Sequence, residues 1–122
     1  MSKININVTL IEDNKKIYDN VKYIGIKSDN RIVYKENDIT VTLSIFDNYV
    51  CMKRSSKDYV IDLVFMQNEE TKITYNIKQY GIVYLTIFTK RLLVKDYINI
   101  EYYVKEQDKE YEFNLFYEVI EK

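Results

Sequence analysis

Residues 3–11, Lys-Ile-Asn-Ile-Asn-Val-Thr-Leu-Ile, alternate polar and apolar side chains over almost their whole length. The apolar residues from Ile4 to Leu10 occupy every second position, which places them on one face of an extended strand. The Lys, Asn and Thr side chains between them share the other face. Residues 3–11 are therefore predicted to form a strand with one dry face and one wet face.

The composition extends this prediction to the rest of the chain. Ile, Val, Thr, Tyr and Phe together account for 53 of the 122 residues, while Ala and Pro are absent. β-branched and aromatic side chains favour pleated surfaces, whereas Ala is the residue that most favours a helix. We expect about ten short strands joined by polar turns, with no substantial helix. The expected strands cover residues 3–11, 17–27, 31–34, 39–46, 49–54, 58–66, 71–77, 82–94, 97–105 and 110–120.

The second expected strand contains a change of phase. Its early apolar residues, such as Val21, lie in a different phase from Ile24 and Ile26. A switch of this kind predicts a bulge or bend, either near residues 19–20 or at Gly25.

The pairing of the later strands tests the prediction, because a one-residue slip would turn the dry face outward. With two-residue loops between the last three strands, Phe88 lies opposite Tyr103 on the wet face. Val104 then lies opposite Ile87 on one neighbour and opposite Tyr111 on the other, always on the dry face. These strands therefore agree in one antiparallel meander.

The hairpin before them continues the same dry face. A three-residue loop at 79–81 sets Ile77 against Val83 and places Gly81 in the left-handed conformation that Gly adopts at least cost. A meander with one dry face must close, because an open sheet would expose that face and two edges. We predict a single all-β domain over residues 1–122, an antiparallel up-and-down barrel of about eight to ten strands.

Three segments of this meander carry a family resemblance. Tyr80-Gly81-Ile82, Thr86-Ile87-Phe88-Thr89 and Ile98-Asn99-Ile100-Glu101-Tyr102 resemble the YwiB-like family, a group of uncharacterised bacterial proteins. The resemblance implies a lipocalin-like, calycin-type β-barrel of about this length. The family has no established activity, so the resemblance implies no catalytic residue and leaves the function open.

The missing residue types exclude several kinds of chemistry. His is absent and Cys occurs once, at Cys51, which excludes a triad with a His base, a His-liganded metal and an internal disulfide. Two Gly residues are too few for a Gly-rich phosphate loop. No cofactor or metal is expected. An enzyme is the least favoured class, because the Tyr, Lys, Asp and Glu side chains show no recognisable catalytic arrangement.

Charge and hydropathy argue against nucleic acid and membrane partners. The 18 basic and 19 acidic residues give a net charge of −1 and a pI near 5.5, so no global field attracts phosphate backbones. The first residues alternate instead of forming the apolar run of a signal peptide, and no segment approaches membrane-spanning length. The expected location is the cytoplasm.

The barrel lumen is the first candidate site. The dry phase directs several Tyr side chains inward, where they either bind a guest or fill the space themselves. It also directs Arg91 inward at the lumen mouth, where a guanidinium would bind the carboxylate or phosphate of an amphiphilic ligand, unless a bulge leaves Arg91 in water. The predicted ligand-binding residues are Tyr59, Tyr75, Arg91, Tyr102 and Tyr111.

The outward face of the last strands is the second candidate site. This face is unusually apolar, and an exposed apolar cluster usually marks a contact surface, although a loop or the N-terminal arm would also cover it. The predicted interface residues are Tyr84, Phe88, Tyr103 and Phe116. Two hypotheses follow: a non-catalytic barrel that binds a small apolar or amphiphilic molecule, or a filled barrel that forms a homodimer or binds a partner through this face.

Overall fold

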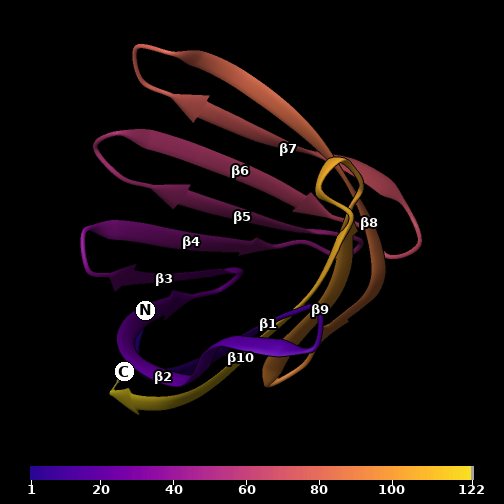
Figure 1. Cartoon of the computed structure of the whole chain (residues 1–122). Coiled ribbons are helices and arrows are strands. Elements are labelled where there is room, and N and C mark those ends of the chain that lie inside the picture. The colour runs from indigo at the N-terminus through magenta and orange to yellow at the C-terminus, as the bar shows by residue number, and fades with distance from the viewer. Residues whose placement is uncertain (122) are drawn as a thin grey trace.

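A computed structural model describes residues 1–121 of the chain and consists almost entirely of antiparallel strands (Figure 1). Lys122, which the expected domain also includes, lies outside the described residues. The elements are β1 (Ser2–Glu12), β2 (Lys15–Ser28), β3 (Arg31–Glu36), β4 (Ile39–Ile45), β5 (Val50–Ser55), β6 (Tyr59–Phe65), β7 (Glu70–Ile77), β8 (Gly81–Val94), β9 (Tyr97–Val104), the 3-10 turn η1 (Lys105–Gln107) and β10 (Lys109–Glu121).

The ten strands follow one another in chain order around a closed barrel. β1 pairs with both β2 and β10, which leaves no free edge in the sheet. The N and C labels accordingly lie close together in Figure 1. The predicted all-β, up-and-down meander barrel is confirmed.

The interior of the barrel divides into two halves. At one end, marked by the turns at residues 29–30, 46–49 and 95–96, apolar side chains pack without contact with solvent, and we call this end the filled half. The opposite end, which carries η1 and the turn at residues 37–38, holds the cavity described below, and we call it the open half. The side chains that pack the filled half include Ile4, Ile32, Leu43, Val50, Phe65, Ile98 and Leu115.

A bulge in β2 turns one aromatic side chain toward the open half. Val8 pairs with Val21 but Leu10 pairs with Tyr18, so the register shifts at residues 19–20, as predicted. Asn20 has a left-handed φ of 55°, and its N–H donates a hydrogen bond to Thr9 Oγ1 at 3.0 Å. The extra residue changes which side chains of β2 point into the barrel, and Tyr18 consequently lines the cavity.

Gly25 lies where β2 passes closest to its neighbours. A Cβ atom at this position would lie 2.6 Å from Ile6 Cδ1 and 2.7 Å from the carbonyl oxygen of Val33. Because that oxygen belongs to the backbone, the strands would have to separate to admit a side chain. Gly25 therefore permits the close approach of β1, β2 and β3.

Two of the predicted hairpin registers are wrong by two residues. The β9–β10 connection contains η1 and the left-handed Asp108, so Tyr111 pairs with Tyr102 instead of Val104. The β7–β8 connection spans residues 78–80, so Ile77 pairs with Gly81 instead of Val83. A shift of two residues keeps every side chain on its predicted face, because side chains alternate with a period of two.

Candidate functional site

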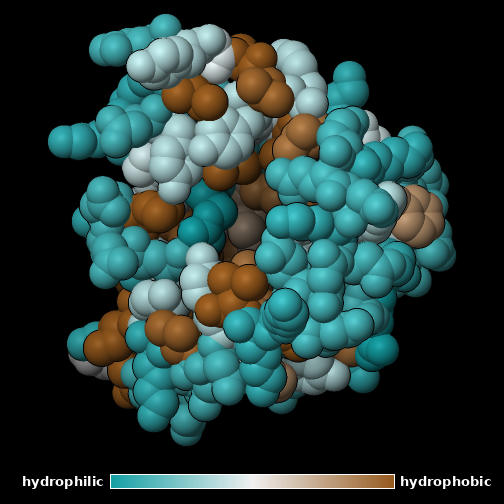
Figure 2. Space-filling view, viewed as in Figure 1, coloured by the Kyte–Doolittle hydropathy of each residue, from teal (hydrophilic) through white to brown (hydrophobic). Residues whose placement is uncertain are grey.

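The open half contains a cavity of about 260 Å³. Figure 2 shows the molecule hollowed at the centre of the view, where hydrophobic surface lies at depth beside hydrophilic side chains. The wall is mainly apolar and comes from most strands of the barrel, with Met52, Leu63, Ile73 and Leu85 among its members. A concave, mostly apolar site with a few polar groups is the usual form of a small-molecule site.

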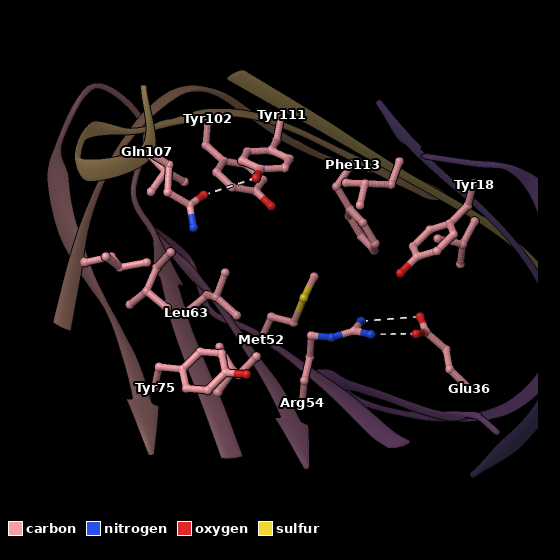
Figure 3. A pocket seen from close by; sticks show the side chains of 16 residues that line it. Tyr18, Glu36, Met52, Arg54, Leu63, Tyr75, Tyr102, Gln107, Tyr111 and Phe113 are labelled. Atoms are coloured by element: carbon pink, nitrogen blue, oxygen red, sulfur yellow. Dashed lines mark hydrogen bonds and ion pairs between the residues drawn. The ribbon is translucent and has the colours of Figure 1, made fainter. Parts of the chain in front are cut away.

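The charged groups of the cavity wall are Arg54 from β5 and Glu36 from β3 (Figure 3). Arg54 donates two hydrogen bonds to the Glu36 carboxylate, from Nη2 to Oε1 at 2.6 Å and from Nη1 to Oε2 at 3.3 Å. Their side chains are 19% and 8% exposed, respectively, so both charges are largely removed from water. Burial alone lowers the pKa of Arg54, but the hydrogen bonds and charge of Glu36 outweigh it and leave the pKa above its ordinary value. The guanidinium therefore stays charged.

Stacked tyrosines and one polar loop form another part of the cavity wall. The rings of Tyr102 and Tyr111 stack with centroids 5.2 Å apart. The Tyr111 hydroxyl donates to Glu12 Oε1 at 2.9 Å, and Gln107 Oε1 lies 3.2 Å from the same hydroxyl. Burial, followed by the hydrogen bond to Glu12, raises the pKa of Tyr111 to about 12. Burial also raises the pKa of Tyr102, so both phenols are uncharged at neutral pH.

The loop that carries Gln107 is fixed to the neighbouring strand β8. The Glu106 carboxylate accepts hydrogen bonds from the backbone N–H of Thr86 at 2.6 Å and from its hydroxyl at 2.8 Å. These hydrogen bonds, the backbone one first, lower the pKa of Glu106 and keep it ionised. The Glu106 contacts therefore hold Gln107 at the cavity.

Three of the four predicted lumen tyrosines line the cavity. Tyr75, Tyr102 and Tyr111 belong to its wall, and Figure 3 shows them on two different sides of it. Tyr59 lies outside the lining but stacks on Tyr75, with ring centroids 5.6 Å apart. Sequence reasoning missed Tyr18, whose hydroxyl points toward the cavity on the side of Arg54 in Figure 3.

The predicted inward orientation of Arg91 is wrong. β8 is bulged between Thr89 and Arg91, so Arg91 pairs with Glu101 on the outer face, and Leu92 takes the place opposite Ile100. Arg91 is exposed and contributes nothing to the cavity. The bulge adds one residue to β8, which reverses the face of every side chain after it.

The arginine of the lumen was detectable from the sequence. The inward phase of β5 runs through Val50 and Met52 and leads directly to Arg54. In β3 the same phase runs from Ile32 to Glu36, two residues beyond the predicted end of that strand. Arg54 already lies within the predicted strand 49–54, so extending the third strand to its observed end at Glu36 would have placed two opposite charges inside the barrel.

The predicted outer face does not form one continuous patch. Phe88 does pair with Tyr103, but Phe116 pairs with Tyr97, whose ring it contacts at a centroid distance of 5.2 Å. Tyr97 and Tyr103 are about 20 Å apart along β9, at a rise of about 3.3 Å per residue. Polar rows of the sheet, including the pair Asn99 and Asn114, lie between these two contacts. Tyr84 is 58% exposed and is separated from Phe88 by Thr86, which binds Glu106.

The charged groups of the cavity neutralise each other. The pKa values of Tyr102 and Tyr111 are raised, away from the range of a base at neutral pH. Among residues 1–121, no three carboxylate or thiol side chains come together as ligands for a metal ion. Over the same residues, no helix has the length and hydropathy to cross a membrane.

The barrel is similar to a solved bacterial structure. The crystal structure of the YwiB protein from Bacillus subtilis superposes with a TM-score of 0.74, over 98% of this chain and 92% of that chain. The sequence identity is 16%, so this likeness establishes the fold alone. No family model and no curated protein matches the sequence.

Proposed function

We propose that this protein is a non-catalytic binding barrel that holds one small, mainly apolar or amphiphilic molecule in its open half. The observation that carries the proposal is the cavity of about 260 Å³, which remains while the other half of the same barrel is packed solid. Water has a share of about 30 Å³ in the liquid, so the cavity has room for about nine non-hydrogen atoms. The polar end of the guest lies at Arg54 and Glu36, the role that sequence reasoning gave to Arg91.

Filling the cavity tests this function. Leu85 lines the cavity from β8, and the variant Leu85→Trp places a bulky ring in the space. We expect the wild type to bind benzyl alcohol, followed by NMR chemical shifts of the cavity methyl groups, and Leu85→Trp to lose this binding. The matched control is Ile82→Trp on the same strand, because Ile82 is 51% exposed and lies outside the cavity lining.

Native mass spectrometry of protein purified from cells supplies the second test. A bound small molecule on the wild type, absent from Leu85→Trp, supports the proposal. A wild-type protein that arrives without a guest and whose spectrum benzyl alcohol does not change would overturn it.

A contact surface around Phe88 and Tyr103 is the second candidate function. The direct pairing of these two half-buried rings on the outer face supports it. If this surface forms a homodimer, Phe88→Lys converts the dimer to a monomer in light scattering, whereas Phe116→Lys, at the far end of β9 and β10, does not. A molecular mass that is unchanged by Phe88→Lys removes this candidate.

The finer assignment of the chain is also a proposal. We place it as a distant member of the YwiB-like family with a lipocalin-like, calycin-type barrel, supported by the superposition and by the chain-order meander. The cytoplasm is the proposed location, supported by the single free thiol of Cys51.

A further inference from the structure

The charge of the guest can be inferred from the charged pair in the cavity wall, provided that the proposed function holds. Arg54 and Glu36 meet in a two-pronged contact at 2.6 and 3.3 Å, so each charge already has its counter-charge. Both side chains lie in the cavity wall and are mostly buried. A guest therefore meets a neutral pair rather than a free guanidinium.

A neutral pair does not compensate a charged guest. A carboxylate that enters the cavity leaves its water behind, which carries a cost of several kcal/mol for an ion. Arg54 attracts this carboxylate, but Glu36 repels it from almost the same distance because the two groups are in contact. The same cancellation applies to a cation, with the roles of Arg54 and Glu36 exchanged. The wall is otherwise mainly apolar and supplies no further charge.

The pair does retain hydrogen-bonding capacity for an uncharged group. A guanidinium has five N–H donors and a carboxylate about four acceptor sites, and their mutual contact uses two of each. Arg54 therefore keeps unused donors and Glu36 unused acceptors, on two side chains that are in contact (Figure 3). A carboxamide presents both an acceptor and a donor, and it loses much less hydration free energy on entry than an ion does.

The size of the cavity limits the rest of the guest. Room for about nine non-hydrogen atoms accommodates a single ring with one polar substituent, whereas a long acyl chain would extend beyond the cavity. The surfaces of Met52, Leu63 and Leu85 provide an apolar wall for such a ring. We propose that the open half selects a small uncharged molecule that joins an apolar body to a group with both a hydrogen-bond donor and an acceptor, and that it discriminates against carboxylates.

Three probes of equal size and different charge test the proposal. Benzamide is neutral, benzoate is an anion and benzamidinium is a cation at pH 7, and all three have the same number of non-hydrogen atoms. Their dissociation constants for the full chain are measured by NMR titration. We expect the wild type to bind benzamide at least tenfold more tightly than benzoate and benzamidinium.

The isosteric variant Glu36→Gln then reverses the preference. The glutamine side chain of this variant retains an acceptor for Arg54 but carries no charge, so Arg54 becomes an uncompensated cation. We expect benzoate to gain at least tenfold in affinity and to bind more tightly than benzamide. Arg54→Gln makes the opposite change and favours benzamidinium. The control Glu110→Gln removes the carboxylate of an exposed pair with Lys90 on the outer face and leaves all three affinities unchanged.

The outcomes separate the two proposals. Wild-type preference for benzamide together with reversal in Glu36→Gln supports the charge selectivity. Equal or tighter binding of benzoate by the wild type, or a preference that Glu36→Gln leaves unchanged, overturns the selectivity while the binding function stands. No binding of any probe by the wild type or by either variant overturns the binding function, and the selectivity with it.

Discussion

The two halves of the barrel share ten strands and one alternating pattern, yet only one of them retains a cavity. In the filled half the fully buried side chains are mainly Ile, Leu, Val and Phe, with Phe65 and Ile98 almost completely buried. In the open half the inward positions carry the long polar side chains Glu36 and Arg54 and several tyrosines. Filling an apolar space with a side chain whose polar end lacks a partner costs free energy. The kinds of side chain in the lumen, rather than the number of strands, therefore determine which half is filled and which half is hollow.

The largest expected effect is a loss of stability caused by a substitution in the filled half. Phe65→Ala removes a fully buried ring that packs on the ring of Tyr102, with the two ring centroids 4.9 Å apart. We expect a loss of about 4 kcal/mol in the free energy of unfolding. The matching change in the open half, Leu85→Ala, should cost about 1 to 2 kcal/mol, because Leu85 is only half-buried beside the cavity. Urea unfolding followed by circular dichroism measures both, and equal losses would contradict the division into two halves.

The next effect concerns the charged pair. Glu36→Leu leaves the Arg54 guanidinium without its counter-charge in a mostly buried place, and we expect a loss of about 3 kcal/mol. Replacing both partners, Glu36→Leu with Arg54→Met, should return the free energy of unfolding to within about 1 kcal/mol of the wild type. A double variant as unstable as the single one would show that the pair contributes more than its mutual neutralisation. Both are measured by urea unfolding at pH 7.

A smaller effect of the opposite sign is expected at the boundary between the halves. Tyr34 lies on β3 between Ile32 of the filled half and Glu36 of the open half, and its buried hydroxyl has no hydrogen-bond partner among the described residues. Tyr34→Phe should therefore stabilise the protein by about 1 kcal/mol. Tyr111→Phe, which removes a hydroxyl that donates to Glu12, should destabilise it by about the same amount. The melting temperatures of the two variants are compared with that of the wild type by thermal unfolding. A melting temperature of Tyr34→Phe below that of the wild type would refute the expectation.

The last effect is a pH dependence confined to alkaline solution. The pKa of Tyr111 is raised to about 12, whereas an unfolded Tyr titrates near pH 10. The folded state thus holds the proton more tightly, so this stabilisation is complete below about pH 10 and disappears as the pH rises toward 12. The free energy of unfolding should fall over this interval, and Tyr111→Phe should reduce the slope. Part of the dependence of the free energy of unfolding on pH should persist in Tyr111→Phe, since burial also raises the pKa of Tyr102 and Tyr34. A slope identical in the wild type and in Tyr111→Phe would contradict the prediction.

The alternation of polar and apolar residues predicted which face each side chain occupies better than it predicted which residues pair across neighbouring strands. Ile4, Ile6 and Val8 enter the core as the period of two requires, because a slip would have turned them to water. Tyr111 also points inward as predicted, although the added residues of η1 give it a different partner. Pairing registers depend on how many residues a turn absorbs, and polar turn sequences do not determine that number.

The candidate site was predicted less well, for two physical reasons. The bulge after Thr89 has no Gly to mark it, so the inward phase was continued to Arg91, although the bulge shifts it to Leu92. Glu36 lies where a polar residue near a turn indicates the end of a strand, although its carboxylate is buried by its contact with Arg54. Such a pair is visible only when two strands distant in sequence are considered together.

The closure of the barrel has a consequence for its synthesis. β1 depends on β10 for one of its two edges, and contacts such as that between Glu12 and Tyr111 join residues 99 positions apart. During translation β10 leaves the ribosome after the other nine strands, so the sheet keeps an unpaired edge until then. Folding that depends on such distant pairing is slow. The nascent chain is consequently most prone to aggregation just before its final strand emerges, a period in which chaperones that shield exposed strand edges would act.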